Sequence, residues 1–191
     1  MKVHYLVRVL GTALALGFIV GGCGGGGSGS SNRVTVGGNA HFPVANGGQA
    51  VTDTPFVIID PDRPDDPLSS DVSTGTGRFF GIIRKTVSVA VILTGTVQGE
   101  SIRVSGLLAA ESNNTTKQLD GQTDIACEAG VSAVIDGSIT GNDLDAERIQ
   151  TLEDAAARFV ATTDFTDPAS VTASALQVRA LTDNGAHPAS Q

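Results

Sequence analysis

The sequence predicts an α+β protein in which an antiparallel β-sandwich is followed by a helical extension. From residue 33 to about residue 110, short runs rich in Val, Ile and Thr alternate with turn-forming Gly, Asn and Asp. Short strands separated by turns, with no helical stretch between them, are typical of an antiparallel sandwich. From residue 119 onward, apolar residues recur at the three- or four-residue spacing of an α-helix. A chain of 191 residues is long enough for one domain with an appendage.

The β part is expected to contain five strands. Phe56-Val57-Ile58-Ile59 is a continuous apolar run, as in a strand that is buried on both faces. Thr86-Val87-Ser88-Val89-Ala90-Val91 alternates with period two, which places the three valines on one face. The acidic, proline-rich segment 60–67 is expected to be a loop. The expected strands are 33–36, 54–60, 78–83, 86–94 and 101–108.

Three helices are expected after the strands. Asp120 or Thr123 can cap the first, Asn142 or Asp143 the second, and Asp167 the third, where Pro168 follows in the favoured first turn. Their apolar stripes are narrow and rich in Ala, so residues 119–185 are expected to pack on the sandwich as an extension, with 186–191 as a disordered tail. The expected helices are 122–135, 143–162 and 168–182.

The N-terminus has the pattern of a secretory signal. Lys2 and Arg8 precede an apolar stretch at 9–20, and two small residues stand before Cys23. Val20-Gly21-Gly22-Cys23 resembles the lipobox of bacterial lipoproteins, in which the cysteine is acylated and becomes the new N-terminus. The resemblance implies a signal peptide at 1–22 and a lipid on Cys23. The alternative is an ordinary signal peptide with a chance cysteine.

A Gly/Ser-rich tether is expected at 23–32, because residues 24–32 are almost entirely Gly and Ser. Such a segment holds a lipid-anchored domain clear of the headgroups. In the lipoprotein family, the absence of Asp after the acylated cysteine goes with export to the outer membrane. Gly24 therefore implies that location, on the periplasmic or surface face, if the host has two membranes.

The composition limits the partners. A net charge of -8 disfavours nucleic acid, which proteins hold mainly through Lys and Arg. It also disfavours direct adsorption to anionic lipid, so the lipid anchor is expected to carry the membrane attachment. With Cys23 acylated, Cys127 has no partner for an intrachain disulfide. We expect Cys127 to lie buried in a helix as a small apolar residue.

Two motifs stand beside the expected strands of the β part: Pro43-Val44-Ala45-Asn46 precedes the strand at 56–60, and Gly77-Arg78-Phe79 follows a Ser-Asp turn. In these motifs the β part resembles the carboxypeptidase regulatory-like, or transthyretin-like, sandwich modules of secreted bacterial proteins. The resemblance covers residues 33–110 and implies that Gly77 turns the chain into a strand whose Phe79 enters the core. It implies an architecture and leaves the ligand open.

No catalytic arrangement is predicted, so we expect a protein that is not an enzyme. After the signal, the histidines are His41 and His187, without the spacing of a zinc site. Ser105 lacks the Gly-x-Ser-x-Gly frame of a nucleophile elbow. The rival hypothesis is a hydrolase with paired carboxylates, Asp60 or Asp62 with Asp71.

Two acidic clusters are candidate calcium sites, and no other cofactor is expected. Asp60, Asp62, Asp65 and Asp66 could supply oxygen ligands, although a solvated loop whose charges keep a sheet edge soluble is the favoured explanation. Asp136 and Glu147 occupy the first and twelfth positions of an EF-hand-like segment. That segment lacks two inner carboxylates, and a turn between two helices is the alternative.

These observations together lead to an expectation about function. We expect a lipid-anchored cell-envelope protein of non-catalytic type that binds a protein or glycan or serves a structural role. A calcium-binding adhesion module is a third hypothesis beside this one and the hydrolase.

Overall fold

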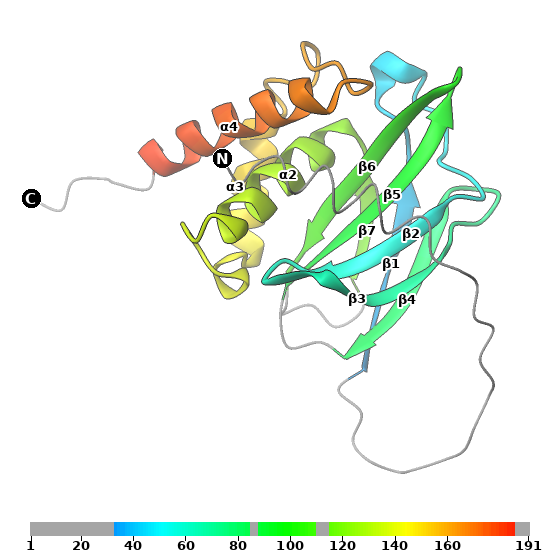
Figure 1. Cartoon of the computed structure of the whole chain (residues 1–191), viewed down its shortest axis with the longest axis horizontal. Helices are drawn as coiled ribbons and strands as arrows, with labels where there is room; N and C mark the ends of the chain where they lie inside the picture. The colour runs from blue at the N-terminus through cyan, green and yellow to red at the C-terminus, as the bar shows by residue number, and fades with distance from the viewer. Residues whose placement is uncertain (1–32, 85–87, 110–114, 186–191) are drawn as a thin grey trace, which may run out of the picture.

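The computed structural model describes residues 33–84, 88–109 and 115–185, and these residues form stacked layers (Figure 1). A three-stranded sheet packs on one face of a four-stranded sheet, and the helices cover the other face. The predicted α+β class, with strands preceding helices, is confirmed. No helix in the described ranges is long and apolar enough to cross a membrane.

The three-stranded sheet has the order β4-β1-β7. Its central strand β1 (Arg33–Ala40) pairs antiparallel with β4 (Arg78–Arg84) and parallel with β7 (Thr115–Leu119). The chain passes very close to β7 at Gly38, where a Cβ would overlap the carbonyl oxygen of Lys117 and lie 2.8 Å from Phe79 Cζ. Glycine is therefore required at this position.

The four-stranded sheet is antiparallel, with the order β3-β2-β5-β6. The ring of Phe56 packs edge-on against the ring of Phe79 on β4, with 6.0 Å between the centroids, which joins the two sheets. The contact between the sheets continues two residues further along each strand, at Gly81 of β4 and Ile58 of β2. A Cβ on Gly81 would lie 2.5 Å from Ile58 Cδ1. The strands are β2 (Pro55–Asp60), β3 (Arg63–Val72), β5 (Val89–Val97) and β6 (Glu100–Leu108).

Two strands differ from the sequence-based expectation. The segment 60–67, expected as a loop, is a turn followed by the first half of β3. Pro64 and Pro67 are accommodated because β3 is an edge strand and its register with β2 is irregular around Ile59. Strand β7 lies beyond the expected end of the sandwich at residue 110 and pairs parallel with β1, so the sandwich is not purely antiparallel.

The helices are α2 (Gly121–Ile135), α3 (Ala146–Ala156) and α4 (Pro168–Gly185). Asp120 caps α2 as expected, and the hydroxyl of Thr123 accepts from the Asp120 N–H to complete a capping box. The carboxylate of Asp167 accepts from the N–H of Ala169 at the start of α4. For α3 the expected caps Asn142 and Asp143 are wrong, because 141–143 form a separate 3₁₀ turn and Asp145 caps the helix.

Helix α2 is the centre of the helical layer. It packs against β6 and β7 of the two sheets and against both α3 and α4. Residues on every side of it are buried, so the narrow stripe expected from Ile125, Ala129 and Ala133 is incomplete. Core residues of the sheets and of the helices form one continuous hydrophobic cluster.

Candidate functional site

A cluster of polar side chains is buried where α2 packs on β6. Along β6, Ile102 and Val104 face the other sheet, so the alternate residues Arg103 and Ser105 face α2. Asp124 and Glu128 lie one turn apart on α2, which places both carboxylates on the same side of the helix. The two elements therefore bring one cation and two carboxylates together inside the protein.

Arg103 bridges the two carboxylates. Its Nε donates to Asp124 Oδ1 at 3.0 Å, and its Nη1 donates to Glu128 Oε2 at 2.8 Å. The Ser105 hydroxyl donates to the same Asp124 oxygen at 2.6 Å. The Arg103 side chain is 24% exposed, whereas the side chains of Asp124 and Glu128 are 1% and 4% exposed. One edge of the cluster thus reaches the surface through Arg103.

The electrostatic balance of the cluster is incomplete. Burial raises the pKa of Asp124, even though Arg103 and the Ser105 hydroxyl act in the opposite direction. For Arg103, burial lowers the pKa, but the carboxylates of Asp124 and Glu128 outweigh it and the pKa is raised. The second oxygen of Asp124, Oδ2, is buried without a hydrogen-bond partner. Two buried carboxylates share one guanidinium here, so Arg103 is the group on which the cluster depends.

Cys127 lies in α2 between the two carboxylates and is buried, as expected from the sequence. Burial raises the pKa of its thiol to about 12, with the neighbouring Ser105 hydroxyl acting against the shift. A thiol with such a pKa is almost entirely protonated at neutral pH and is a poor nucleophile. The Ser105 hydroxyl donates to a carboxylate, and the described histidine, His41, contacts the carbonyl of Gly48 elsewhere. The ion pairs and hydrogen bonds of this cluster therefore hold α2 against β6.

The first acidic cluster lies at the β2–β3 hairpin. Asp60 is 9% exposed at the end of β2, and its Oδ1 accepts from the N–H of Asp62 at 3.0 Å. Asp62 Oδ1 accepts from the N–H of Gly141, also at 3.0 Å, which ties the hairpin to the turn before α3. Asp65 and Asp66 are exposed on β3. Two of the four carboxylates thus bind backbone N–H groups.

The second predicted pair, Asp136 and Glu147, lies on two different elements. Asp136 follows the end of α2, where Oδ2 accepts from Arg179 of α4 at 2.7 Å and Oδ1 accepts from Ser138. Glu147 is exposed in the first turn of α3. In the part of the chain that the structure describes, no three His, Cys, Asp or Glu side chains are grouped so that they could hold a metal ion.

The carboxylates of the hydrolase hypothesis are also apart. Asp60 pairs with Arg63 at one end of the β2–β3 ladder, and Asp71 pairs with Phe56 near the other end. Phe56 and Asp60 are four residue steps apart along β2, which corresponds to about 13 Å. This distance exceeds the roughly 5–9.5 Å that separates the two carboxylates of a glycosidase. The structure does not bring Asp71 together with Asp60 or Asp62.

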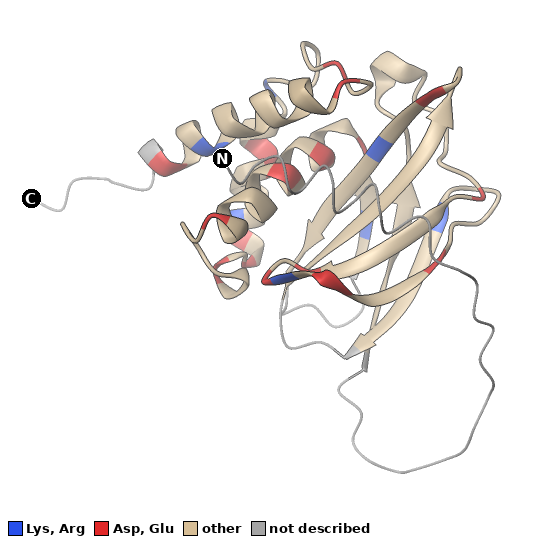
Figure 2. Cartoon of the chain, in the orientation of Figure 1, with Lys and Arg blue, Asp and Glu red and all other residues tan. Residues whose placement is uncertain are grey.

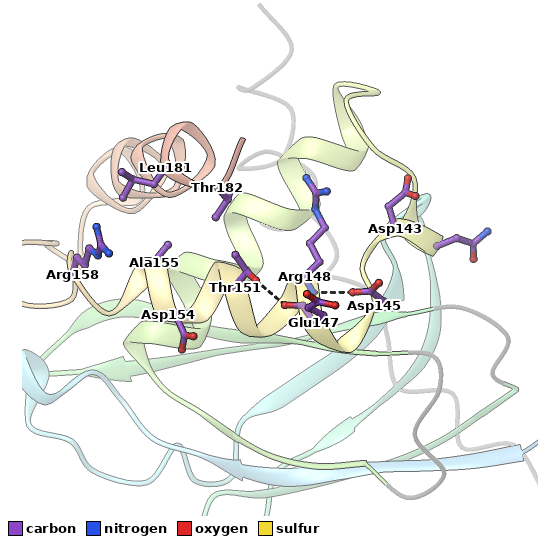
Figure 3. A pocket seen from close by; sticks show the side chains of 11 residues that line it. Asp143, Asp145, Glu147, Arg148, Thr151, Asp154, Ala155, Arg158, Leu181 and Thr182 are labelled. Atoms are coloured by element: carbon purple, nitrogen blue, oxygen red, sulfur yellow. Dashed lines mark hydrogen bonds between the residues drawn. The ribbon is translucent and has the colours of Figure 1, made fainter. Parts of the chain in front are cut away.

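An open groove of about 780 Å³ lies between α3 and α4 (Figure 3). Two of its polar side chains are bonded locally: Asp145 accepts from the N–H of Arg148, and the Thr151 hydroxyl donates to the carbonyl of Glu147. The Nε of Arg148 is buried without a hydrogen-bond partner. Arg148 Nη2 lies 3.7 Å from the carboxylate of Asp183 on α4. The charged lining residues are Asp143, Asp145, Glu147, Arg148, Asp154 and Arg158.

The fold and its buried cluster define an α+β protein whose central helix is fixed to a sheet by ion pairs. No protein-family model, curated protein or solved structure matches this sequence. The predicted lipidation residue Cys23 and the second histidine, His187, lie outside the described residues. Sequence reasoning missed Arg103 as a member of this cluster. The available signal was the pair Asp124 and Glu128, two carboxylates one turn apart in a helix that is otherwise mainly apolar.

Proposed function

We propose that this protein is a lipid-anchored cell-envelope protein of non-catalytic, binding or structural type. One observation carries the proposal: Val20-Gly21-Gly22-Cys23 ends a basic and then apolar leader and is followed at once by a Gly/Ser segment. The lipobox resemblance places an acyl group on Cys23 and, with Gly24 next, the protein at the outer membrane of a host with two membranes. The partner is then an envelope protein or a glycan.

The folded part is consistent with a tethered domain. Its first strand starts at Arg33, so residues 24–32 alone separate it from Cys23, and they can extend to about 30 Å. The second cysteine, Cys127, is buried in the core and inaccessible to an acylating enzyme. Cys23 is therefore the cysteine that the proposal requires.

The described polar groups support a non-catalytic role. Ser105 and Cys127, the nucleophile types inside the buried cluster, are 1% and 3% exposed and are held in packing contacts. We further propose that the sandwich is related to the carboxypeptidase regulatory-like, or transthyretin-like, modules. Gly77 has a positive φ of 74° and Phe79 is 2% exposed, in keeping with the turn and core positions that this resemblance implies.

The test is metabolic labelling of the full chain with palmitate in a bacterial host. We expect label on the wild-type chain and on Cys127→Ala, a conservative change at the other cysteine, and no label on Cys23→Ser. An unlabelled wild-type chain, or a Cys23→Ser chain labelled as strongly as wild type, contradicts the anchor. Pull-down with the labelled protein, tested against envelope proteins and peptidoglycan, then addresses the partner.

A further inference from the structure

The net negative charge of the chain is distributed very unevenly over its layers. Twelve of the 20 acidic residues follow Leu119, together with only three of the 12 basic residues. Figure 2 shows many of these carboxylate residues on the helices. In contrast, strands β1 and β4 contain Arg33, Arg78 and Arg84 and no acidic residue. The three-stranded sheet is therefore basic in a protein that is acidic as a whole.

The outer face of this sheet carries exposed apolar side chains. Along β4, Phe79 and Ile83 point into the core, whereas Phe80 and Ile82 between them are 57% and 52% exposed. Arg78 belongs to the same outward alternation, is exposed, and forms no salt bridge within the described ranges. The face thus combines two large apolar side chains with an unneutralised arginine.

The residues of β1 that pair with Phe80 and Ile82 are small, so the two large side chains stand out from the face. Ile82 pairs with Thr35 and Phe80 pairs with Gly37, so small side chains stand beside the two large ones. The basic residue of β7, Lys117, is turned away from this face and is ion-paired with Glu153 of α3. Among the described side chains, Arg78 therefore supplies the basic character of the outer face.

This sheet is also the one that the tether enters. Arg33, the first residue of β1, directly follows the Gly/Ser segment and stands opposite Arg84 in the register. A lipid on Cys23 would keep this end of the sheet within about 30 Å of the bilayer. The face with exposed Phe80 and Ile82 is thus held close to lipid at high effective concentration.

We propose that the outer face of the β4-β1-β7 sheet docks on an anionic phospholipid surface. Phe80 and Ile82 enter the headgroup region and Arg78 lies at the lipid phosphates, as in other interfacial surfaces that combine apolar and basic residues. The inference rests on the proposed lipid anchor. It revises the expectation from net charge alone, that the protein avoids anionic lipid.

Distance removes the conflict with the acidic helices. Stacked sheets lie about 10 Å apart, and the helices form a further layer beyond the four-stranded sheet. Glu153, the α3 carboxylate that reaches this sheet, is ion-paired with Lys117 of β7. The helical carboxylates beyond the four-stranded sheet are more than one Debye length, about 8 Å at physiological salt, from a surface touched by Phe80. Repulsion of the helical layer favours the same orientation, with the basic sheet on the lipid.

The chain offers a direct assay because it contains no tryptophan. Ile82→Trp places one reporter on the docking face, and Leu176→Trp places a matched reporter on α4, where Leu176 is 50% exposed. The full-length acylated proteins are reconstituted in vesicles of brominated phosphatidylcholine with and without phosphatidylglycerol. Phe80→Trp serves as a second reporter in case Ile82→Trp folds poorly.

We expect bromolipid to quench the Ile82→Trp reporter and not the Leu176→Trp reporter, more strongly with phosphatidylglycerol and less at high salt. Adding Arg78→Ala should lower the docked-to-undocked ratio about fivefold, which corresponds to roughly 1 kcal/mol per arginine near an anionic surface. Arg158→Ala, on the helical side, should leave the ratio unchanged.

Equal quenching at both positions, or quenching indifferent to phosphatidylglycerol, overturns the proposal. A blue shift of the Ile82→Trp reporter that rises with protein concentration without vesicles also overturns it, because a second copy then covers the face. Palmitate label on the same samples separates the two proposals. Labelled protein without position-dependent quenching refutes docking alone, whereas unlabelled protein refutes the anchor.

Discussion

Replacing Arg103 with methionine removes the cation that joins Asp124 and Glu128 while keeping most of the side-chain volume. The two carboxylates are 1% and 4% exposed and lose partners at 3.0 and 2.8 Å. Removing one member of a buried ion pair typically destabilises a protein by about 3–5 kcal/mol, because the remaining charge is buried without compensation. For a domain of this size, that corresponds to a Tm lower by about 6–20 °C.

The loss should also depend on pH. Burial already raises the pKa of Asp124, and Arg103 is the largest influence that opposes this shift. Without Arg103, the folded-state pKa rises further above its unfolded value. A carboxyl with a raised folded pKa stabilises the fold below its unfolded pKa of about 4, and this contribution is lost as pH rises through the folded pKa. Arg103→Met should therefore be most destabilised near pH 7 and least near pH 4.

Urea unfolding followed by circular dichroism, at both pH values, measures these differences. Arg148→Met is the matched control, because the half-buried Arg148 and the exposed Asp183 are 3.7 Å apart, and such solvent-accessible pairs contribute at most about 1 kcal/mol. Adding Asp124→Asn to Arg103→Met should recover part of the loss, since it removes one uncompensated charge. If Arg103→Met lost no more stability than Arg148→Met, or lost equally at both pH values, the cluster would not act as described.

Two other predictions concern close packing. Gly38→Ala should lower the free energy of unfolding by about 3 kcal/mol or more, because its Cβ would overlap the backbone of Lys117. Gly75→Ala, whose Cβ would make only an ordinary contact with Asp53 Oδ2 at 4.0 Å, should change it by less than about 0.5 kcal/mol. Similar urea midpoints for these two variants would contradict the close approach of β1 and β7. In a Cys23→Ser chain, Cys127 should react with a thiol reagent at pH 8 about a thousandfold more slowly than a free cysteine, because its pKa is raised to about 12. Labelling at the rate of the urea-unfolded chain would show that the thiol is accessible.

Local sequence patterns predicted those elements whose pattern of apolar and polar residues matches the burial of their side chains in the fold. The run Phe56-Val57-Ile58-Ile59 is a strand with both faces covered, and Asp120 and Asp167 cap the helices that they precede. Strand β3 was missed because Pro64 and Pro67 normally indicate a loop, and the exception depends on the strand being at an edge. Edge position is a property of the tertiary fold and leaves no local signal.

The same limit applies to the buried cluster and to β7. Arg103 and Ser105 alternate with Ile102 and Val104, which is the pattern of a strand with one solvated face. That face is covered by α2, a helix whose burial on all sides could not be recognised from a stripe of Ile and Ala alone. Strand β7 is short and polar, and its parallel partner β1 is separated from it by most of the β part of the chain. Long-range pairing of this kind depends on the whole topology.

The position of β1 in the centre of its sheet has a mechanical consequence. A pull on the tether enters the domain at Arg33, in a strand that is hydrogen-bonded to β4 on one side and to β7 on the other. The load is therefore divided between two ladders, which must yield together, whereas a strand at the edge could be peeled away one hydrogen bond at a time. Because β7 is the last strand of the chain, resistance to that pull is complete only when residues 115–119 are in place.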